Sequence, residues 1–91
     1  MPLNAADKPR LGKGVRVRRE TDGSSMLLVP EGALALNATA AATLELVDGT
    51  RSVAEIAAQL VERFDVDEHQ ASEDVSRLLE RLAERRFVET S

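Results

Sequence analysis

The side chains that could do acid–base or metal chemistry are few. The single histidine, His69, follows Asp67 and Glu68, and the sequence contains no cysteine. Acidic residues at a helix start are favoured by the helix dipole, and three neighbours there do not converge as metal ligands must. Without cysteine, thiol nucleophiles, disulfides and Cys-ligated clusters are excluded. We therefore expect no metal and no cofactor.

Further carboxylates lie among arginines in the C-terminal third of the chain. The residues concerned are Glu73, Asp74, Glu80 and Glu84 with Arg77, Arg81 and Arg85. At helical spacing such charges form ion pairs on a solvated face. A serine nucleophile needs a histidine beside it, and the only imidazole is at an exposed helix start. The sequence therefore argues against a free-standing enzyme.

The distribution of charge and of apolar residues limits which partners and which cellular compartment are compatible with this chain. Residues 1–19 carry a net charge of +5, whereas residues 20–91 carry −9. An acidic body argues against nucleic-acid and anionic-membrane partners. No apolar run reaches the ~18 residues of a membrane span. The first residues have neither the basic nor the apolar part of a signal peptide, so we expect a cytoplasmic protein.

The elements that must position these side chains begin with strands. Residues 1–9 hold two prolines and no periodicity, so they predict a flexible arm, and residues 10–91 predict a single domain. Valines alternate with arginines over 15–18, which predicts a half-buried strand. Asp22-Gly23 supplies the positive φ angles of a tight hairpin turn. A strand apolar on both faces follows at 26–29.

A third strand and three helices complete the pattern. Residues 30–32 predict a turn, and residues 33–36 form a short strand without charge. Asn37 caps a helix over 38–48 that Gly49 ends in a left-handed cap. A Ser52–Glu55 capping box starts the second helix, and Asp67 starts the third. The order predicts an α+β, winged-helix-like domain: a three-stranded antiparallel sheet followed by a three-helix bundle.

The uncharged third strand is the best candidate for a binding site. A strand at a sheet edge exposes unpaired backbone groups, and an extended peptide can add there as another strand. We therefore nominate Leu34, Ala35 and Leu36 as the edge. On the third helix, Arg77 and Arg81 lie on one flank of the apolar stripe, beside Leu78, and can pair with acidic peptide side chains. The spacing does not tell which flank faces the edge strand.

Two alternatives are open at this point. The second and third helices resemble a helix-turn-helix by length and spacing, which suggests a winged-helix DNA-binding regulator. Residues 67–76 contain four acids and no lysine or arginine, however, so their negative charge would repel DNA phosphates. The strand over 26–29, apolar on both faces, suggests instead a homodimer that covers one face.

Two runs carry a resemblance that covers most of the chain. Leu-Val-Pro-Glu-Gly-Ala-Leu-Ala-Leu-Asn over 28–37 is followed by Val-Asp-Gly-Thr-Arg-Ser-Val-Ala-Glu-Ile over 47–56. Together with the apolar stripe over 74–82 they resemble the pyrroloquinoline quinone biosynthesis protein D family. The turn before the last strand often carries Gly in that family. Here it is Arg85-Arg86-Phe87, where a left-handed cap costs about 1 kcal/mol.

The resemblance implies a function without catalysis. Members of the family act as peptide chaperones that bind the ribosomally made precursor peptide of pyrroloquinoline quinone. They present it to a radical S-adenosylmethionine enzyme, and the peptide adds beside the third strand against the third helix. The binding role thereby falls on six residues: Leu34, Ala35, Leu36, Arg77, Leu78 and Arg81.

Overall fold

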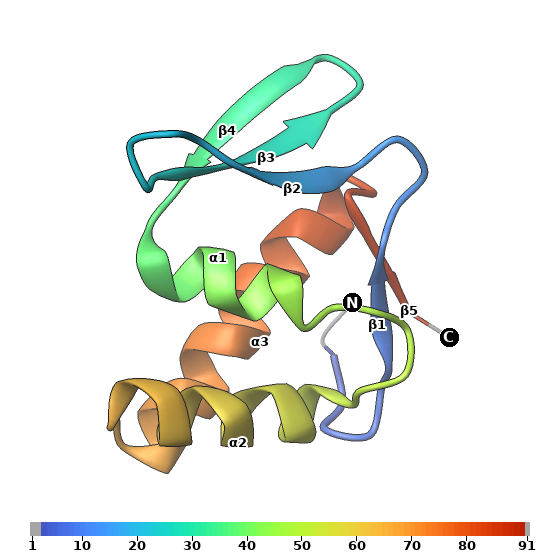
Figure 1. Cartoon of the computed structure of the whole chain (residues 1–91). Helices are drawn as coiled ribbons and strands as arrows, with labels where there is room; N and C mark the ends of the chain where they lie inside the picture. Colours follow the sequence, from blue (N-terminus) through green and yellow to red (C-terminus); the bar gives the residue numbers. More distant parts are fainter. Residues whose placement is uncertain (1–2, 91) are drawn as a thin grey trace.

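The structure is a computed structural model that describes residues 3–90 as an α+β domain (Figure 1). In chain order its elements are β1 (Pro9–Leu11), β2 (Arg16–Arg19), β3 (Ser25–Val29), β4 (Gly32–Leu36), α1 (Ala38–Glu45), α2 (Val53–Phe64), α3 (Glu68–Glu84) and β5 (Val88–Thr90). The strands β2, β3 and β4 form an antiparallel sheet in that order. This sheet and the three helices confirm the predicted fold class.

The sheet packs one face onto the helices. Val17, Leu27 and Leu34 lie opposite one another on the three strands, and Leu27 is 0% exposed. Because side chains alternate along a strand, the alanines of β4 point the other way. The hairpin before β3 differs from the prediction, since of its Asp-Gly pair only Gly23 has a positive φ. Asp22 instead accepts hydrogen bonds from the N–H and hydroxyl of Ser24.

The core lies where α1, α2 and α3 meet under this sheet. Its most deeply buried aliphatic side chains are Leu27, Leu44, Ile56, Leu60, Val75, Leu79 and Val88. On α2 and α3 they recur at the three- and four-residue spacing that gives a helix one apolar face. The apolar stripe over residues 74–82 is therefore confirmed as core at Val75, Leu79 and Leu82, and half-buried Leu78 packs against it.

The first helix is shorter than predicted. α1 ends at Glu45 rather than at residue 48, and the N–H of Leu46 donates to Thr43 O at 3.1 Å in a tightened last turn. Gly49 has a positive φ of 83°, but its N–H donates to Pro9 O at 2.9 Å. The glycine thus forms a contact with β1 instead of a helix cap, and no local pattern reports such a contact.

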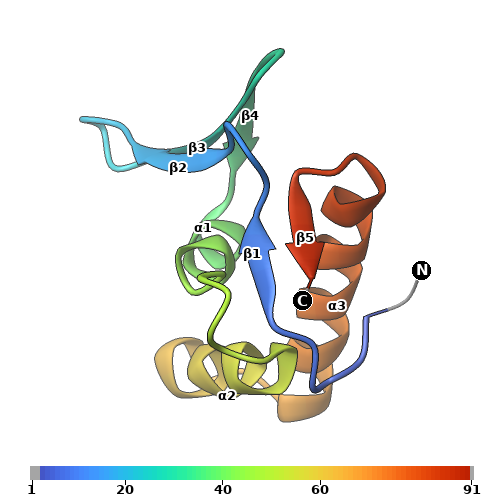
Figure 2. The ribbon, with the colours of Figure 1, turned by 90° about the vertical axis from the view of Figure 1, so that its right-hand side faces the viewer.

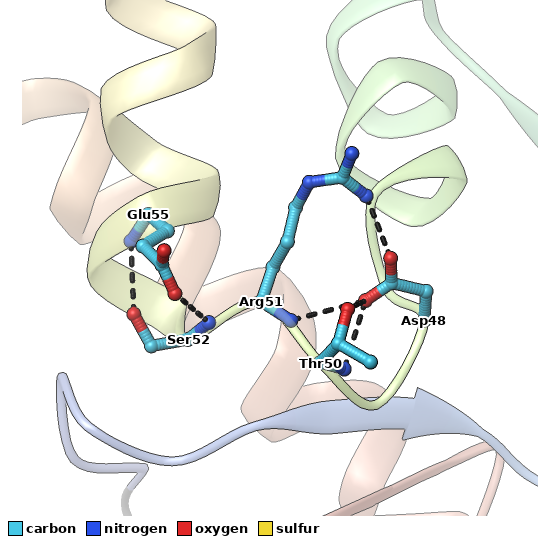
Figure 3. A network of polar contacts seen from close by, with 5 residues as sticks. All are labelled: Asp48, Thr50, Arg51, Ser52 and Glu55. Carbon is cyan, nitrogen blue, oxygen red and sulfur yellow. Dashed lines mark hydrogen bonds and ion pairs between the residues drawn. The ribbon is translucent and has the colours of Figure 1, made fainter.

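A network of polar contacts fixes the start of α2 (Figure 3). The predicted capping box is present: Ser52 N donates to Glu55 Oε1 at 2.8 Å, and Glu55 N donates to Ser52 Oγ at 3.1 Å. Before it, one carboxylate oxygen of Asp48 accepts from the N–H groups of Thr50 and Arg51. These bonds lower the pKa of Asp48 to about 2, because they stabilise its ionised form.

The two ends of the described chain pair with each other. β1 and β5 form an antiparallel two-stranded sheet in which Leu11 lies opposite Val88. Before β1, the N–H groups of Val53 and Ala54 donate to Asp7 O and Ala5 O at 2.9 and 3.0 Å. We predicted a flexible arm over residues 1–9 and foresaw none of these contacts. The flexibility of the arm stays a prediction. Within residues 3–90, no helix is long and apolar enough to cross a membrane.

Candidate functional site

The site begins at the free edge of β4. β4 is the last strand of the β2-β3-β4 sheet, and among the described residues no strand pairs with its outer edge. It carries no charged side chain. Leu34 and Leu36 are half-buried and pack against the core, whereas Ala35 is exposed. The inward leucines anchor the strand, and its outer backbone edge is available for another strand.

The chain leaves β4 directly into a groove. Leu36 is followed by Asn37, the N-cap of α1, whose side chain accepts from Ala40 N at 2.8 Å. From Asn37 onward, the start of α1 faces α3 across a cavity of about 250 Å³. Its lining residues are Asn37, Thr39, Ala40, Thr43, Leu60, Val66, Ala71, Asp74, Arg77, Leu78 and Arg81. We call this cavity the α1–α3 groove.

The floor of the α1–α3 groove is apolar. Leu60 and Ala71 are 2% and 3% exposed, and half-buried Leu78 packs against the core beside them. Val66, between α2 and α3, is the most exposed large hydrophobic residue of the described chain, at 36%. Small residues such as Ala40 on the facing helix leave the space open. An apolar side chain of a bound segment would therefore be removed from water when it enters the groove, which favours binding.

The rim of the groove is charged along α3. Asp74 accepts a hydrogen bond from Gln70 Nε2 at 2.9 Å and lies 3.9 Å from Arg77 Nη1. Arg81, one turn further on, is exposed and makes no hydrogen bond or ion pair with the described residues. A guanidinium in this state can bind a carboxylate of a partner through two parallel hydrogen bonds.

The structure brings three of the six predicted site residues into one groove. Arg77, Leu78 and Arg81 line one groove, and the β4 edge runs into its other wall at Asn37. It also identifies the flank that sequence spacing left open: the flank with Arg77 and Arg81 faces α1. The opposite flank, with Ser72 and Ser76, lines a second, more open surface beside His69 and Glu80, which Arg77 also borders. The residues 34–36 contribute a neighbouring edge, not the groove lining itself.

Sequence reasoning missed half of the groove. Asn37 was assigned only a capping role, and Thr39, Ala40 and Thr43 were placed only within the helix predicted over 38–48. Val66 lies outside both predicted helix stripes, so periodicity could not place it. The available signal was the position of Asn37, because a residue that directly follows an edge strand must lie near that edge.

Two other readings of this surface receive no support from the geometry. The first half of α3 exposes Asp67, Glu68, Glu73 and Asp74, so the helix that would read DNA carries the wrong charge for phosphates. Within residues 3–90, no three histidine or acidic side chains are grouped as metal ligands would be.

Comparison with known proteins identifies the family. The family model for coenzyme PQQ synthesis protein D (PqqD) matches residues 25–88, which include the β4 edge and the whole groove. The chain belongs to the PqqD family. This confirms the resemblance found in the sequence, and it favours a peptide site over the DNA-binding alternative.

Named relatives support the assignment. The PqqA binding protein of Rhizobium meliloti is 36% identical over 88 residues, which cover 96% of this chain and 90% of that protein. That of Azotobacter vinelandii is 44% identical over 84 residues, covering 91% of this chain and 90% of the relative. In Methylorubrum extorquens the matching 88 residues are 38% identical, cover 96% of this chain and make up 24% of the bifunctional coenzyme PQQ synthesis protein C/D. A PqqD domain therefore also occurs within a longer chain.

Two solved structures share the fold. The solution structure of the PqqD part of Methylobacterium extorquens PqqCD, described as a stand-alone recognition element for ribosomally synthesised and modified peptides, has a TM-score of 0.81. It is 36% identical and covers 96% of this chain and 94% of its own. Lasso peptide synthetase B1, solved with its leader peptide, has a TM-score of 0.75 at 26% identity and covers 90% of this chain and 98% of its own.

Proposed function

We propose that this chain is a non-catalytic peptide chaperone of pyrroloquinoline quinone biosynthesis, which binds the precursor peptide and presents it to a radical S-adenosylmethionine enzyme. The observation that carries the proposal is the continuity of the β4 edge with the α1–α3 groove. Backbone pairing along the edge would hold any extended segment, and the groove would select its side chains. The relatives named PqqA binding protein support this assignment.

Six residues would bind the peptide. Leu34, Ala35 and Leu36 supply the backbone edge, Leu78 supplies apolar surface, and Arg77 and Arg81 bind acidic side chains. The structure solved with a leader peptide has the same fold, which supports a peptide ligand for this one. The domain then acts by proximity, because it raises the local concentration of peptide at the enzyme. We expect this step in the cytoplasm, because the ligand is made by ribosomes.

The experiment is a titration of the isotope-labelled full chain with synthetic precursor peptide, followed by amide shifts. We expect the largest shifts over residues 34–40 and 74–81. Arg81→Glu should weaken binding about tenfold, since a charge-assisted hydrogen bond is replaced by like-charge repulsion. Arg63→Glu makes the same change of net charge on α2 and should leave the peptide affinity unchanged.

Two results would refute the proposal. Shifts that cluster away from β4 and α3 would show that the site is misplaced. Strong, salt-dependent binding of duplex DNA by a chain that does not bind the peptide would restore the DNA-binding alternative.

A further inference from the structure

The outward face of the β2-β3-β4 sheet carries two rows of side chains that the α1–α3 groove does not use. Strand register places Arg16 opposite Leu28, and Arg18 opposite Met26. On the other side of β3, Leu28 lies opposite Ala33 and Met26 opposite Ala35. Each row therefore runs from an arginine on β2 through a large apolar residue on β3 to an alanine on β4.

These rows point away from the core. The alternating residues of the same strands, Val17, Leu27 and Leu34, belong to or pack against the core, whereas Met26 and Leu28 do neither. In both views the sheet lies over α1 on one side, and no described element covers its other side (Figures 1 and 2). Met26 and Leu28 are half-buried although neither packs against the core. A sheet face of this kind, apolar in its centre, is typical of an interaction surface.

The charges on this face decide what kind of protein fits it. Arg16 is exposed and has no hydrogen-bond or ion-pair partner among residues 3–90, and Arg18 binds Glu20 at 2.7 Å. A second copy stacked with β2 over β2 would bring the arginines of both copies together, where they repel, and one stacked with β2 over β4 would set each arginine against an alanine without a carboxylate to bind. An acidic patch elsewhere on a second copy would make a head-to-tail contact, which gives a ring or a filament of many copies. The face instead suits a different protein with carboxylates around an apolar centre.

The face also continues into the proposed peptide site. A peptide that pairs with β4 becomes the next strand of the same sheet, so its outward side chains stand level with Ala33 and Ala35. Alanine side chains are short and leave room beside these peptide residues. A protein seated on the sheet would touch the peptide and the domain at once.

We propose that the outward face of the sheet is the docking surface for the peptide-modifying enzyme, through an acidic patch around an apolar centre. Met26 and Leu28 would fill that centre, and Arg16 would bind its carboxylates, whereas Arg18 would first have to leave Glu20. The proposal rests on the proposed function, because the enzyme must reach the peptide held at β4.

The test measures two affinities of the full chain separately: for the precursor peptide and for the radical S-adenosylmethionine enzyme. Arg16→Glu should weaken enzyme binding about tenfold and reduce its salt dependence, because a rim charge is reversed. Leu28→Thr, which keeps a strand-favouring side chain, should weaken it to a similar extent. Neither variant should change the peptide affinity, and Arg63→Glu should change neither affinity.

Several outcomes would overturn the docking surface. The proposal fails if the wild-type chain does not bind the enzyme, with or without peptide. It also fails if Arg16→Glu leaves the enzyme affinity unchanged. Self-association of the wild-type chain that Arg16→Glu abolishes would assign the face to a second copy. Because Arg16 is exposed, its variant reports on docking even if Leu28→Thr fails to fold. A chain that binds the enzyme but not the peptide would refute the proposed function and leave the surface standing.

Discussion

Arg86 occupies a backbone conformation that side chains usually avoid. Its φ is +64°, immediately after α3. Its N–H donates to Ala83 O at 3.0 Å, and the N–H of Phe87 donates to Leu82 O at 3.0 Å. These two bonds form a Schellman motif, in which glycine is the usual residue at this position. The family's frequent glycine here has therefore been replaced without loss of the turn.

We predict that Arg86→Gly stabilises the protein. Removing the side chain relieves the left-handed strain, so the free energy of unfolding should rise by about 1 kcal/mol. For a domain of this size that raises the midpoint of thermal unfolding by roughly 4–8 °C. Thermal unfolding followed by circular dichroism measures the shift.

The neighbouring position gives a matched control. Arg85 has a φ of −97°, and its guanidinium lies 5.0 Å from the ring centroid of Phe87. Arg85→Gly should therefore lower the midpoint, because it adds chain entropy and removes the ring contact. If both glycine variants shift the midpoint in the same direction, the strain assigned to Arg86 is absent.

Among individual residues, sequence reasoning found one wall of the candidate site and missed the other. The positions of Arg77, Leu78 and Arg81 follow from helical periodicity, which fixes the side chains that share a face. Val66 and Asn37 enter the groove only because α1 and α3 approach each other in space. That approach is a property of tertiary packing and leaves no local pattern.

Among the connecting elements, the loop before α2 depends on one ionised carboxylate. Hydrogen bonds from the N–H groups of Thr50 and Arg51 lower the pKa of Asp48 from 3.8 to about 2. Because the folded-state pKa lies below the unfolded value, the stabilisation is complete above about pH 4. It is lost as the pH falls toward 2.

We predict that Asp48→Asn removes this pH dependence. The variant should be less stable than the wild type at pH 7, since the ionised acceptor and its contact with Arg51 are lost. The difference between the two proteins should shrink as the pH falls from 4 to 2. Denaturant midpoints measured across this range test the prediction, and a constant difference would show that the charge of Asp48 does not stabilise the loop.

Strand and helix types were predictable to different extents. β2, β3 and β4 show alternation or turn residues, and all three helices begin at Asn, Ser or Asp caps, so each was located from local signals. β1 and β5 are three residues each and pair across almost the whole chain. Such short strands carry no readable period, so their pairing could not be foreseen.

For the molecule as a whole, the segment before β1 tests how the ends are held. The N–H groups of Val53 and Ala54 lie in the first turn of α2, where no helix carbonyl can reach them. They donate instead to Asp7 O and Ala5 O. If the segment stays in place, these two amides are protected from hydrogen exchange.

Exchange measured by nuclear magnetic resonance checks this expectation. Val53 and Ala54 should exchange at least about tenfold more slowly than Glu68 and His69. The latter pair holds the same positions on α3 and has no acceptor among the described residues. Equal exchange rates at all four amides would instead confirm the flexible arm predicted for residues 1–9.

The pairing of β1 with β5 has a consequence for protein architecture. The two strands lie side by side at the right of Figure 1, whereas α1 begins, and the groove with it, at the left. A chain attached after β5 therefore departs from the side opposite the groove, whereas the segment before β1 returns along α3, where Leu3 N donates to Glu80 Oε2 at 3.0 Å. A further domain joined after β5 would therefore leave the groove open to its peptide.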